Sequence, residues 1–310
     1  MRFTLQNSGY NALVLADVDG QPEELPETKE VLLSDSNNCL ICTDEKITEP
    51  LVITNNTPMA QSNVFYSAAD NPEMIDAFEK AQDTFKYFWR EVSWEARRIV
   101  PGLDLACVKV AFMQYAPGRQ EPKVEHMWIN DVEFDGEQVS GTLINDPGDI
   151  TNVKKGDFIR VPLSQISDWL FASQDKTYGG FTIHALRAAM SEEERREHDE
   201  AWGLDFGDFN NIEVAARQDE NPDNLIEHPM SINMKESFVK FLQEYPAEIT
   251  NQDEAGYTLL HRETIAGNKS IVEILLQFKA DKNVKAANGK SALDFAKQVG
   301  WEHIVPLLEN

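Results

Sequence analysis

Cysteine is scarce in this 310-residue chain, which has only three, at positions 39, 42 and 107. Cys39 and Cys42 have the spacing of a zinc knuckle or a redox pair. No second Cys-x-x-Cys or His-x-x-x-His pair is present to complete a zinc site, and the flanking residues are typical of turns rather than of a helix start. We interpret the two as reduced cysteines on one strand, and we expect no metal and no cofactor.

Long apolar runs are also missing. No stretch approaches the roughly 18 apolar residues that a transmembrane helix needs. The first ten residues lack the apolar core of a signal peptide. We therefore expect a cytoplasmic protein that does not contact a membrane.

Basic residues are outnumbered, 28 against 53 acidic ones, which gives a formal net charge of -25. Nucleic acids and anionic membranes require a positive surface, so the charge argues against both as partners. An acidic surface keeps a protein soluble and speeds its encounter with a basic partner. The charge thus favours a basic protein as the partner.

Catalytic signatures are absent too: the sequence has no G-x-S-x-G, no H-E-x-x-H and no P-loop. His126, Asp168 and His198 are suitable residue types for a base oriented by a carboxylate. Nothing in their spacing brings them together, and no two histidines lie four residues apart as metal ligands on a helix. A hydrolase that uses these residues is the alternative hypothesis.

The N-terminal part of the chain predicts a small β-rich segment followed by a helix. Residues 1–60 contain short apolar runs between Asn, Asp and Pro clusters. From Pro72, with Asn71 as the N-cap, apolar residues recur at helical spacing. This stripe consists of Met74, Phe78, Ala81, Phe85 and Phe88.

The central part predicts an α+β domain, assigned to residues 64–210 and followed by a linker at 211–231. Short apolar runs alternate with polar residues between positions 105 and 161, with a hairpin turn at Asp135-Gly136. This pattern is typical of a small antiparallel barrel or curled sheet with flanking helices. Ser191 and Glu194 form a capping box for a helix over 192–201.

The C-terminal part contains an internal repeat of 33 residues, the ankyrin period. The matching pairs are Gly256 and Gly289, Leu260 and Leu293, Gly267 and Gly300, Ile271 and Ile304, and Leu275 and Leu308. An upstream half-unit is visible because Phe238, Phe241 and Leu242 lie 33 residues before Ile271, Ile274 and Leu275. We therefore expect an all-α tail of about two and a half ankyrin repeats over residues 232–310.

The central stretch from Asn71 to Asp208 also carries a family resemblance. Its motifs are Tyr87-Phe88-Trp89-Arg90, Glu125-His126-Met127-Trp128, Ser167-Asp168-Trp169, Tyr178-Gly179-Gly180 and Glu197-His198-Asp199 leading to Trp202-Gly203-Leu204-Asp205-Phe206-Gly207. Together they resemble the YegJ-like bacterial domain of unknown function. The resemblance implies a shared fold and a bacterial origin, and it implies no catalytic residues.

These observations favour a protein-binding module, acting as a bacterial immunity or regulatory protein. Its partner would be a basic toxin or effector that it blocks, or a complex that it scaffolds, by stoichiometric binding. In the central domain we expect His126, Trp128, Trp169 and Tyr178 to line one concavity. In the tail we expect partner contacts on exposed loops and first helices, from Tyr257, Arg262, Lys285, Asn288 and Lys290.

Overall fold

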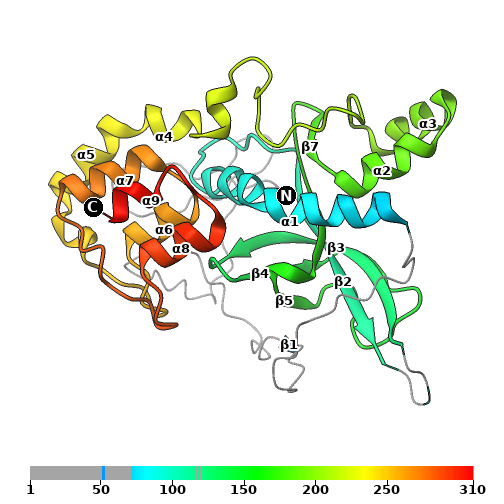
Figure 1. Cartoon of the computed structure of the whole chain (residues 1–310), viewed down its shortest axis with the longest axis horizontal. Helices are drawn as coiled ribbons and strands as arrows, with labels where there is room; N and C mark the ends of the chain where they lie inside the picture. The colour runs from blue at the N-terminus through cyan, green and yellow to red at the C-terminus, as the bar shows by residue number, and fades with distance from the viewer. Residues whose placement is uncertain (1–50, 53–70, 116–117, 119–120, 310) are drawn as a thin grey trace, which may run out of the picture.

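The computed structural model describes residues 51–52, 71–115, 118 and 121–309. Within these residues a sheet and the helices beside it form a body, and a stack of helices follows toward the C-terminus (Figure 1). Most of the expected β-rich segment, with Cys39 and Cys42, lies outside the described residues. No helix in the described part of the chain is both long enough and apolar enough to cross a membrane.

The described strands form one sheet in the order β1-β5-β4-β3-β2-β6-β7. Their bounds are β1 Leu51–Val52, β2 Leu105–Gln114, β3 Lys123–Phe134, β4 Gln138–Leu143, β5 Phe158–Pro162, β6 Ile166–Ser173 and β7 Lys176–Gly179. Neighbours run antiparallel except β1 and β5, which run parallel. The expected curled antiparallel sheet is thus confirmed in its six strands β2 to β7.

The alternative expectation of a barrel was wrong, because the sheet does not close. A barrel would need its two edge strands to pair with each other. Here β7 pairs with a later part of the chain: the Thr177 amide donates to the Asp205 carbonyl, and the Gly179 amide donates to the Glu213 carbonyl, both at 2.9 Å. This segment accepts the hydrogen bonds from the β7 backbone amides that, in a barrel, would pair with another strand of the sheet.

Helix α1 (Pro72–Glu95) crosses one face of the sheet (Figure 1). Asn71 caps it, as expected, by accepting a hydrogen bond from the Glu73 amide at 3.0 Å. The predicted stripe packs inward, with Phe85 and Phe88 almost fully buried. The Trp169 indole from β6 donates to the Ala81 carbonyl at 3.0 Å, which joins the helix to the sheet through a buried polar contact.

The remaining helices of the body follow β5 and β7. The 3-10 turn η1 (Leu163–Gln165) leads into β6, and after β7 come α2 (Phe181–Ala189), α3 (Glu192–Trp202) and the 3-10 turn η2 (Pro222–Leu225). The segment at 211–231, assigned to a linker, packs on the body, and Asn224 and His228 within it are each 7% exposed.

The tail forms helix pairs that recur at the expected period. It consists of α4 (Pro229–Asn233), α5 (Lys235–Glu244), η3 (Pro246–Ile249), α6 (Leu259–Ile265), α7 (Lys269–Gln277), α8 (Ala292–Val299) and α9 (Val305–Glu309). Helices α6 and α8 each begin at a capping box, at Thr258 and at Ser291, 33 residues apart. Their shared core includes Leu242, Leu260, Ile271, Leu275, Ile304 and Leu308.

One repeated glycine of the tail is required by packing as well as by its backbone. Gly267 has φ +76°, and a Cβ there would lie 2.4 Å from the Trp301 ring. The Trp301 indole in turn donates to the Ile265 carbonyl at 3.0 Å. Successive repeats therefore meet where the Trp301 ring packs directly against Gly267. A residue larger than glycine at position 267 would clash with that ring.

Candidate functional site: an acidic helix beside a docked ankyrin stack

Helix α3 is strongly acidic, and none of its side chains is fully buried. Six of its eleven residues are acidic and two are basic. It begins at the predicted capping box, in which the Glu194 carboxylate accepts from the Ser191 amide at 2.7 Å. It ends at Gly203, whose φ of 66° terminates the helix in the left-handed region. Both ends of the helix are therefore fixed by its own sequence.

Arg187 of α2 holds α3 against the body. Its guanidinium donates to the two Asp199 carboxylate oxygens at 3.0 and 2.6 Å and to the Gly207 carbonyl at 3.1 Å. Arg187 is 4% exposed, so this bidentate pair is shielded from water, unlike an ordinary surface ion pair. The His198 ring bonds the same Asp199 carboxylate at 2.8 Å. The helix is anchored firmly although it contributes no residue to the core.

The chain around α3 extends the same negative surface. Between positions 192 and 223 it has twelve acidic and three basic residues. After the helix, the exposed acidic residues are Asp205, Asp208, Asp219, Glu220 and Asp223. Trp202, in the last turn, is 39% exposed, and its ring meets the edge of Phe206 at 5.8 Å. The region thus combines a negative electrostatic potential with an exposed aromatic side chain, that of Trp202.

The inner face of the ankyrin stack is docked on the body. Tyr257 is 7% exposed, and its hydroxyl donates to the Asp135 carbonyl at 2.9 Å. Burial, with the nearby Asp135 carboxylate, raises the pKa of Tyr257 to about 12. Asn288 and Lys290 both bond the Glu137 carboxylate, at 2.8 and 2.5 Å. Three of the five tail residues expected to face a partner therefore contact the β3–β4 turn.

The other two expected tail residues, Arg262 and Lys285, are exposed. Arg262 pairs with Asp253 and lies over the Tyr257 ring at 4.4 Å. Beside it, a pocket of about 220 Å³ opens between α1, the end of β3 and α6. Trp89 and Phe134 supply apolar walls of this pocket, which lies at the junction between the body and the tail.

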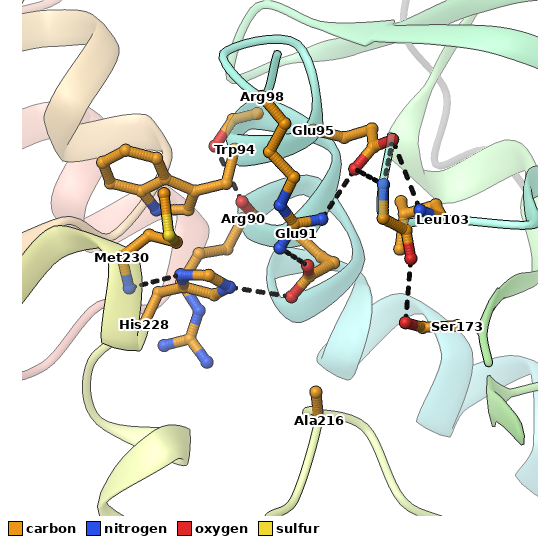
Figure 2. A network of polar contacts seen from close by, with 12 residues as sticks. Arg90, Glu91, Trp94, Glu95, Arg98, Leu103, Ser173, Ala216, His228 and Met230 are labelled. Atoms are coloured by element: carbon orange, nitrogen blue, oxygen red, sulfur yellow. Dashed lines mark hydrogen bonds and ion pairs between the residues drawn. The ribbon is translucent and has the colours of Figure 1, made fainter. Parts of the chain in front are cut away.

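A buried polar network ties α1 to the segment before α4, as Figure 2 shows. Glu91 accepts from Arg98 at 2.6 Å and bonds the His228 Nε2 at 2.9 Å. The other ring nitrogen of His228 accepts from the Met230 amide at 3.1 Å, so Nε2 carries the proton in the neutral ring. Burial alone would raise the pKa of Glu91, but the bonds from His228 and Arg98 outweigh it and lower the pKa.

A second set of bonds joins α1 to the ankyrin stack itself. The Trp94 indole donates to the Asn268 side chain at 2.9 Å, and Asn268 donates to Glu263 at 2.7 Å. Arg97 donates to both oxygens of Glu263 at 3.3 and 2.7 Å. Because every member has a partner, the network favours one relative position of body and stack.

Asp168, a candidate catalytic residue, is fully buried and caps α2. Its carboxylate accepts from the amides of Trp169, Phe181 and Thr182 at 2.9, 3.0 and 2.8 Å, and from the Thr182 hydroxyl at 2.5 Å. Burial raises the pKa of Asp168, opposed by the charge of Lys109 and by these bonds. Lys109 also donates to the Thr182 hydroxyl at 2.7 Å. These contacts give Asp168 the role of a buried helix cap.

The side-chain hydrogen bonds of the two candidate histidines go to residues other than Asp168. The His126 Nδ1 bonds the Ser167 hydroxyl at 2.8 Å, and its ring stacks on Phe78 at 5.2 Å. Burial, with the charge of Lys109, lowers the pKa of His126 to about 4. His198 bonds Asp199 on α3. Ser167 is 1% exposed, so its pairing with His126 offers no route for a substrate.

The aromatic residues expected to line a concavity are divided between core and surface. Trp169 and Tyr178 are 0% and 5% exposed, and both rings stack with the Phe171 ring, at 6.1 and 4.7 Å. Trp128 is half-buried, with the Lys109 ammonium 4.7 Å from its ring. Trp169 and Tyr178 therefore contribute to the core and are not available to a partner.

Sequence reasoning missed the role of Arg187, and it predicted the hairpin turn between β3 and β4 without its role in docking the tail. The available signal for Arg187 was a single arginine inside the otherwise mostly apolar helix that precedes the acidic one. The docking contact of the turn gave no signal, because its partner lies more than 100 positions later in the chain. Within the described residues, no group of three or more His, Cys, Asp or Glu side chains is placed to hold a metal ion.

Comparison with known proteins supports both halves of this architecture. Residues 71–206 match the family described as "Uncharacterized protein conserved in bacteria (DUF2314)". The chain is 46% identical over 251 residues to a putative ankyrin repeat protein of Neisseria meningitidis serogroup B, covering 81% of this chain and 98% of that protein. It is 37% identical over 86 residues to the uncharacterized protein YegJ of Escherichia coli K12, covering 28% of this chain and 56% of YegJ.

The chain also matches a protein from outside bacteria. The ankyrin repeat and SAM domain-containing protein 6 of Rattus norvegicus is 33% identical over 112 residues, which are 34% of this chain and 13% of that protein. The family match and the YegJ match confirm the resemblance to the YegJ-like domain, and the relatives named for ankyrin repeats agree with the repeat found in the tail. The chain belongs to the same family as the Neisseria ankyrin repeat protein, with a YegJ-like DUF2314 domain followed by ankyrin repeats.

Proposed function

We propose that this protein binds a basic protein stoichiometrically, and that the surface of α3 and residues 204–223 makes the main contact. The role we propose is that of a bacterial immunity or regulatory protein acting in the cytoplasm. Relatives named for their ankyrin repeats support protein binding in general. The acidic surface is what supports a basic partner.

One observation carries the proposal: α3 is held rigidly and yet buries none of its side chains. His198 and Trp202 cover the buried ring of Phe206, but no α3 side chain is itself buried, so packing alone accounts for little of a helix that is capped at both ends and clamped by a buried arginine. Preorganisation of this kind lowers the entropic cost of binding. The surface charge would steer a basic partner toward the helix, and the exposed Trp202 would serve as an apolar anchor.

The tail has a supporting place in this proposal. Tyr257, Asn288 and Lys290 are occupied by the β3–β4 turn, so they brace the body rather than contact the partner. Arg262 and Lys285 remain exposed, and we keep them as peripheral contact residues. Nucleic acid and anionic membranes stay disfavoured, because both would be repelled by the same acidic surface.

The test compares two variants with equal loss of charge. In the α3 variant Glu192, Glu197 and Glu200 are changed to Gln, which leaves the capping residue Glu194 and the Arg187 partner Asp199 in place. In the control, the exposed residues Glu133, Glu254 and Glu302 are changed to Gln. Each protein is used to capture partners from cells that naturally make it, and the affinity for the captured partner is then measured by calorimetry.

We expect a partner with a basic isoelectric point, bound one to one, with an affinity that falls as salt is added. The α3 variant should bind about tenfold more weakly at low salt, since three exposed ion pairs together contribute about 1 to 2 kcal/mol. The control should bind like the wild type. An acidic partner, or an α3 variant with unchanged affinity, would contradict the proposal.

A further inference from the structure

The α4–α5 end of the ankyrin stack exposes an apolar surface. Exposed fractions are 49% for Ile232, 37% for Met234, 38% for Phe241 and 50% for Tyr245. The rings of Phe238 and Phe241 lie 5.9 Å apart, and those of Phe241 and Tyr245 lie 5.5 Å apart. The aromatic side chains therefore form a continuous ladder along α5, which we call the α5 stripe together with Met234.

The spacing of the α5 stripe is that of a helix-packing seam. Met234, Phe238, Phe241 and Tyr245 follow one another at steps of four, three and four residues, the pattern that packs one helix along another. Leu242, which is fully buried, faces the ankyrin core from a different side of the same helix. Phe238 packs partly on that core, whereas Met234, Phe241 and Tyr245 are exposed, so the apolar surface of α5 extends beyond the part that the stack covers.

Repeat stacks ordinarily end in a capping repeat with a polar outer surface. Here α5 matches the second helix of a repeat and α4, with five residues, stands in for the first. This end therefore presents the kind of surface that would normally receive another repeat. The geometry calls for a helical partner.

The formal charge of α5 and of the tail around it indicates which helical partner fits the α5 stripe. Helix α5 carries Lys235 and Lys240 against Glu236 and Glu244, so its formal charge is balanced. Residues 232–310 have nine basic and eleven acidic residues, whereas the whole chain has a formal net charge of -25. Helices α3 and α5 lie toward opposite ends of the longest axis (Figure 1). Contact through α5 keeps the acidic surfaces of two copies far apart.

We propose that a second copy of this chain covers the α5 stripe, with α5 packed on α5 about a two-fold axis. Such an isologous contact lets each apolar side chain meet the same surface of the other copy. Because a stable interface buries about 800 Å² per partner, the contact extends from α5 onto α4 and η3. The dimer presents two α3 surfaces, one at each far end, for partner proteins.

The test measures the mass of the full chain in solution by light scattering and sedimentation, over the widest attainable range of concentration. The wild type should reach twice the 35.1 kDa of one chain. Phe241→Glu and Tyr245→Glu should each weaken the dimer by at least about thirtyfold, as expected for an aromatic anchor at the centre of an interface. Leu186→Glu, at a 51% exposed site on α2, is the matched control and should still dimerise.

Because the substituted side chains are exposed, the variants should keep the wild-type circular dichroism spectrum, and their melting temperature should equal that of the wild type at concentrations where it is monomeric. A wild type that stays monomeric at every concentration would overturn the proposal. So would a dimer that survives both α5 substitutions, or one that Leu186→Glu disrupts. Binding of a basic partner through α3 should persist in the monomeric variants, so failure here is distinguishable from failure of the proposed function.

Discussion

Two of the side chains that look most reactive in the sequence, Asp168 and His126, make contacts that stabilise the fold. Asp168 accepts hydrogen bonds from the first amides of α2, and Lys109 lies beside it. His126 is half-buried and His184 is buried, and burial lowers the pKa of each to about 4. A residue type alone could not distinguish these roles, because the same carboxylate serves as a base or as a helix cap depending on what surrounds it.

The lowered histidine pKa values predict a loss of stability on mild acidification. Between about pH 6.5 and about pH 4, unfolded histidine binds a proton that folded His126 and His184 do not. The free energy of unfolding should therefore fall as the pH falls through this window, by up to about 3 kcal/mol for His126. Urea unfolding at a series of pH values measures this slope.

The variant His126→Gln isolates the contribution of one group. Its loss of stability with pH should be shallower than that of the wild type by about 1.4 kcal/mol per pH unit within the window. The substitution also removes the ring stacked on Phe78, so the slope is the diagnostic quantity rather than the absolute stability. Parallel pH profiles for the two proteins would show that His126 does not titrate as described.

At the scale of elements, the turn between β3 and β4 joins the body to the stack. Gly136 has φ +96°, and a Cβ there would lie 2.6 Å from the Phe295 ring of α8. The Gly136 carbonyl accepts from the Gln298 side chain at 2.7 Å. The glycine is thus required twice, for the turn itself and for the close approach of α8.

Gly136→Ala should therefore destabilise the protein more than a glycine substitution that meets only backbone strain. Gly156 is the matched control, because it has φ +89° and open space where a Cβ would stand. We expect Gly156→Ala to cost about 1 kcal/mol, and Gly136→Ala to cost a further 1 to 3 kcal/mol, approximately, from overpacking. Chemical denaturation compares the two, and equal losses would show that α8 does not press on this turn.

Much of the element level could be predicted from local pattern. The cap at Asn71, the capping box at Ser191 and the 33-residue period each depend on nearby residues, and each is found in the structure. Whether the sheet closes depends on which strands end up as edges, and alternating apolar residues do not encode this. Likewise, the exposure of Tyr257 depended on a turn 122 positions away, which no local pattern reveals.

At the scale of the whole molecule, body and tail share a continuous packed interior. Tyr257, Ile265, Ala286 and Phe295 of the tail belong to the same apolar cluster as α1 and the sheet. Two complete repeats and a partial one are near the minimum for an independent stack. The ankyrin tail therefore depends on the body for part of its stability.

The full chain should consequently unfold in one thermal transition, and an isolated fragment of residues 222–310 should have little helical circular dichroism. The fragment loses the cover that the β3–β4 turn gives Tyr257 and Phe295. The variant Asn268→Ala should have a broader thermal transition than the wild-type chain, because it loses the side-chain oxygen that accepts the hydrogen bond from the Trp94 indole. Two well-separated transitions, or a folded fragment, would show that body and tail are independent.

The central claim is that a partner binds the acidic surface around α3 while the inner ankyrin face stays docked on the body. Hydrogen exchange of the chain alone and in complex with its captured partner tests this claim most directly. The account predicts slower exchange on binding across residues 192–223 and no change at 257–261 or 286–291, the segments that hold the docked residues Tyr257, Asn288 and Lys290. Protection confined to those ankyrin segments, with α3 unchanged, would contradict it.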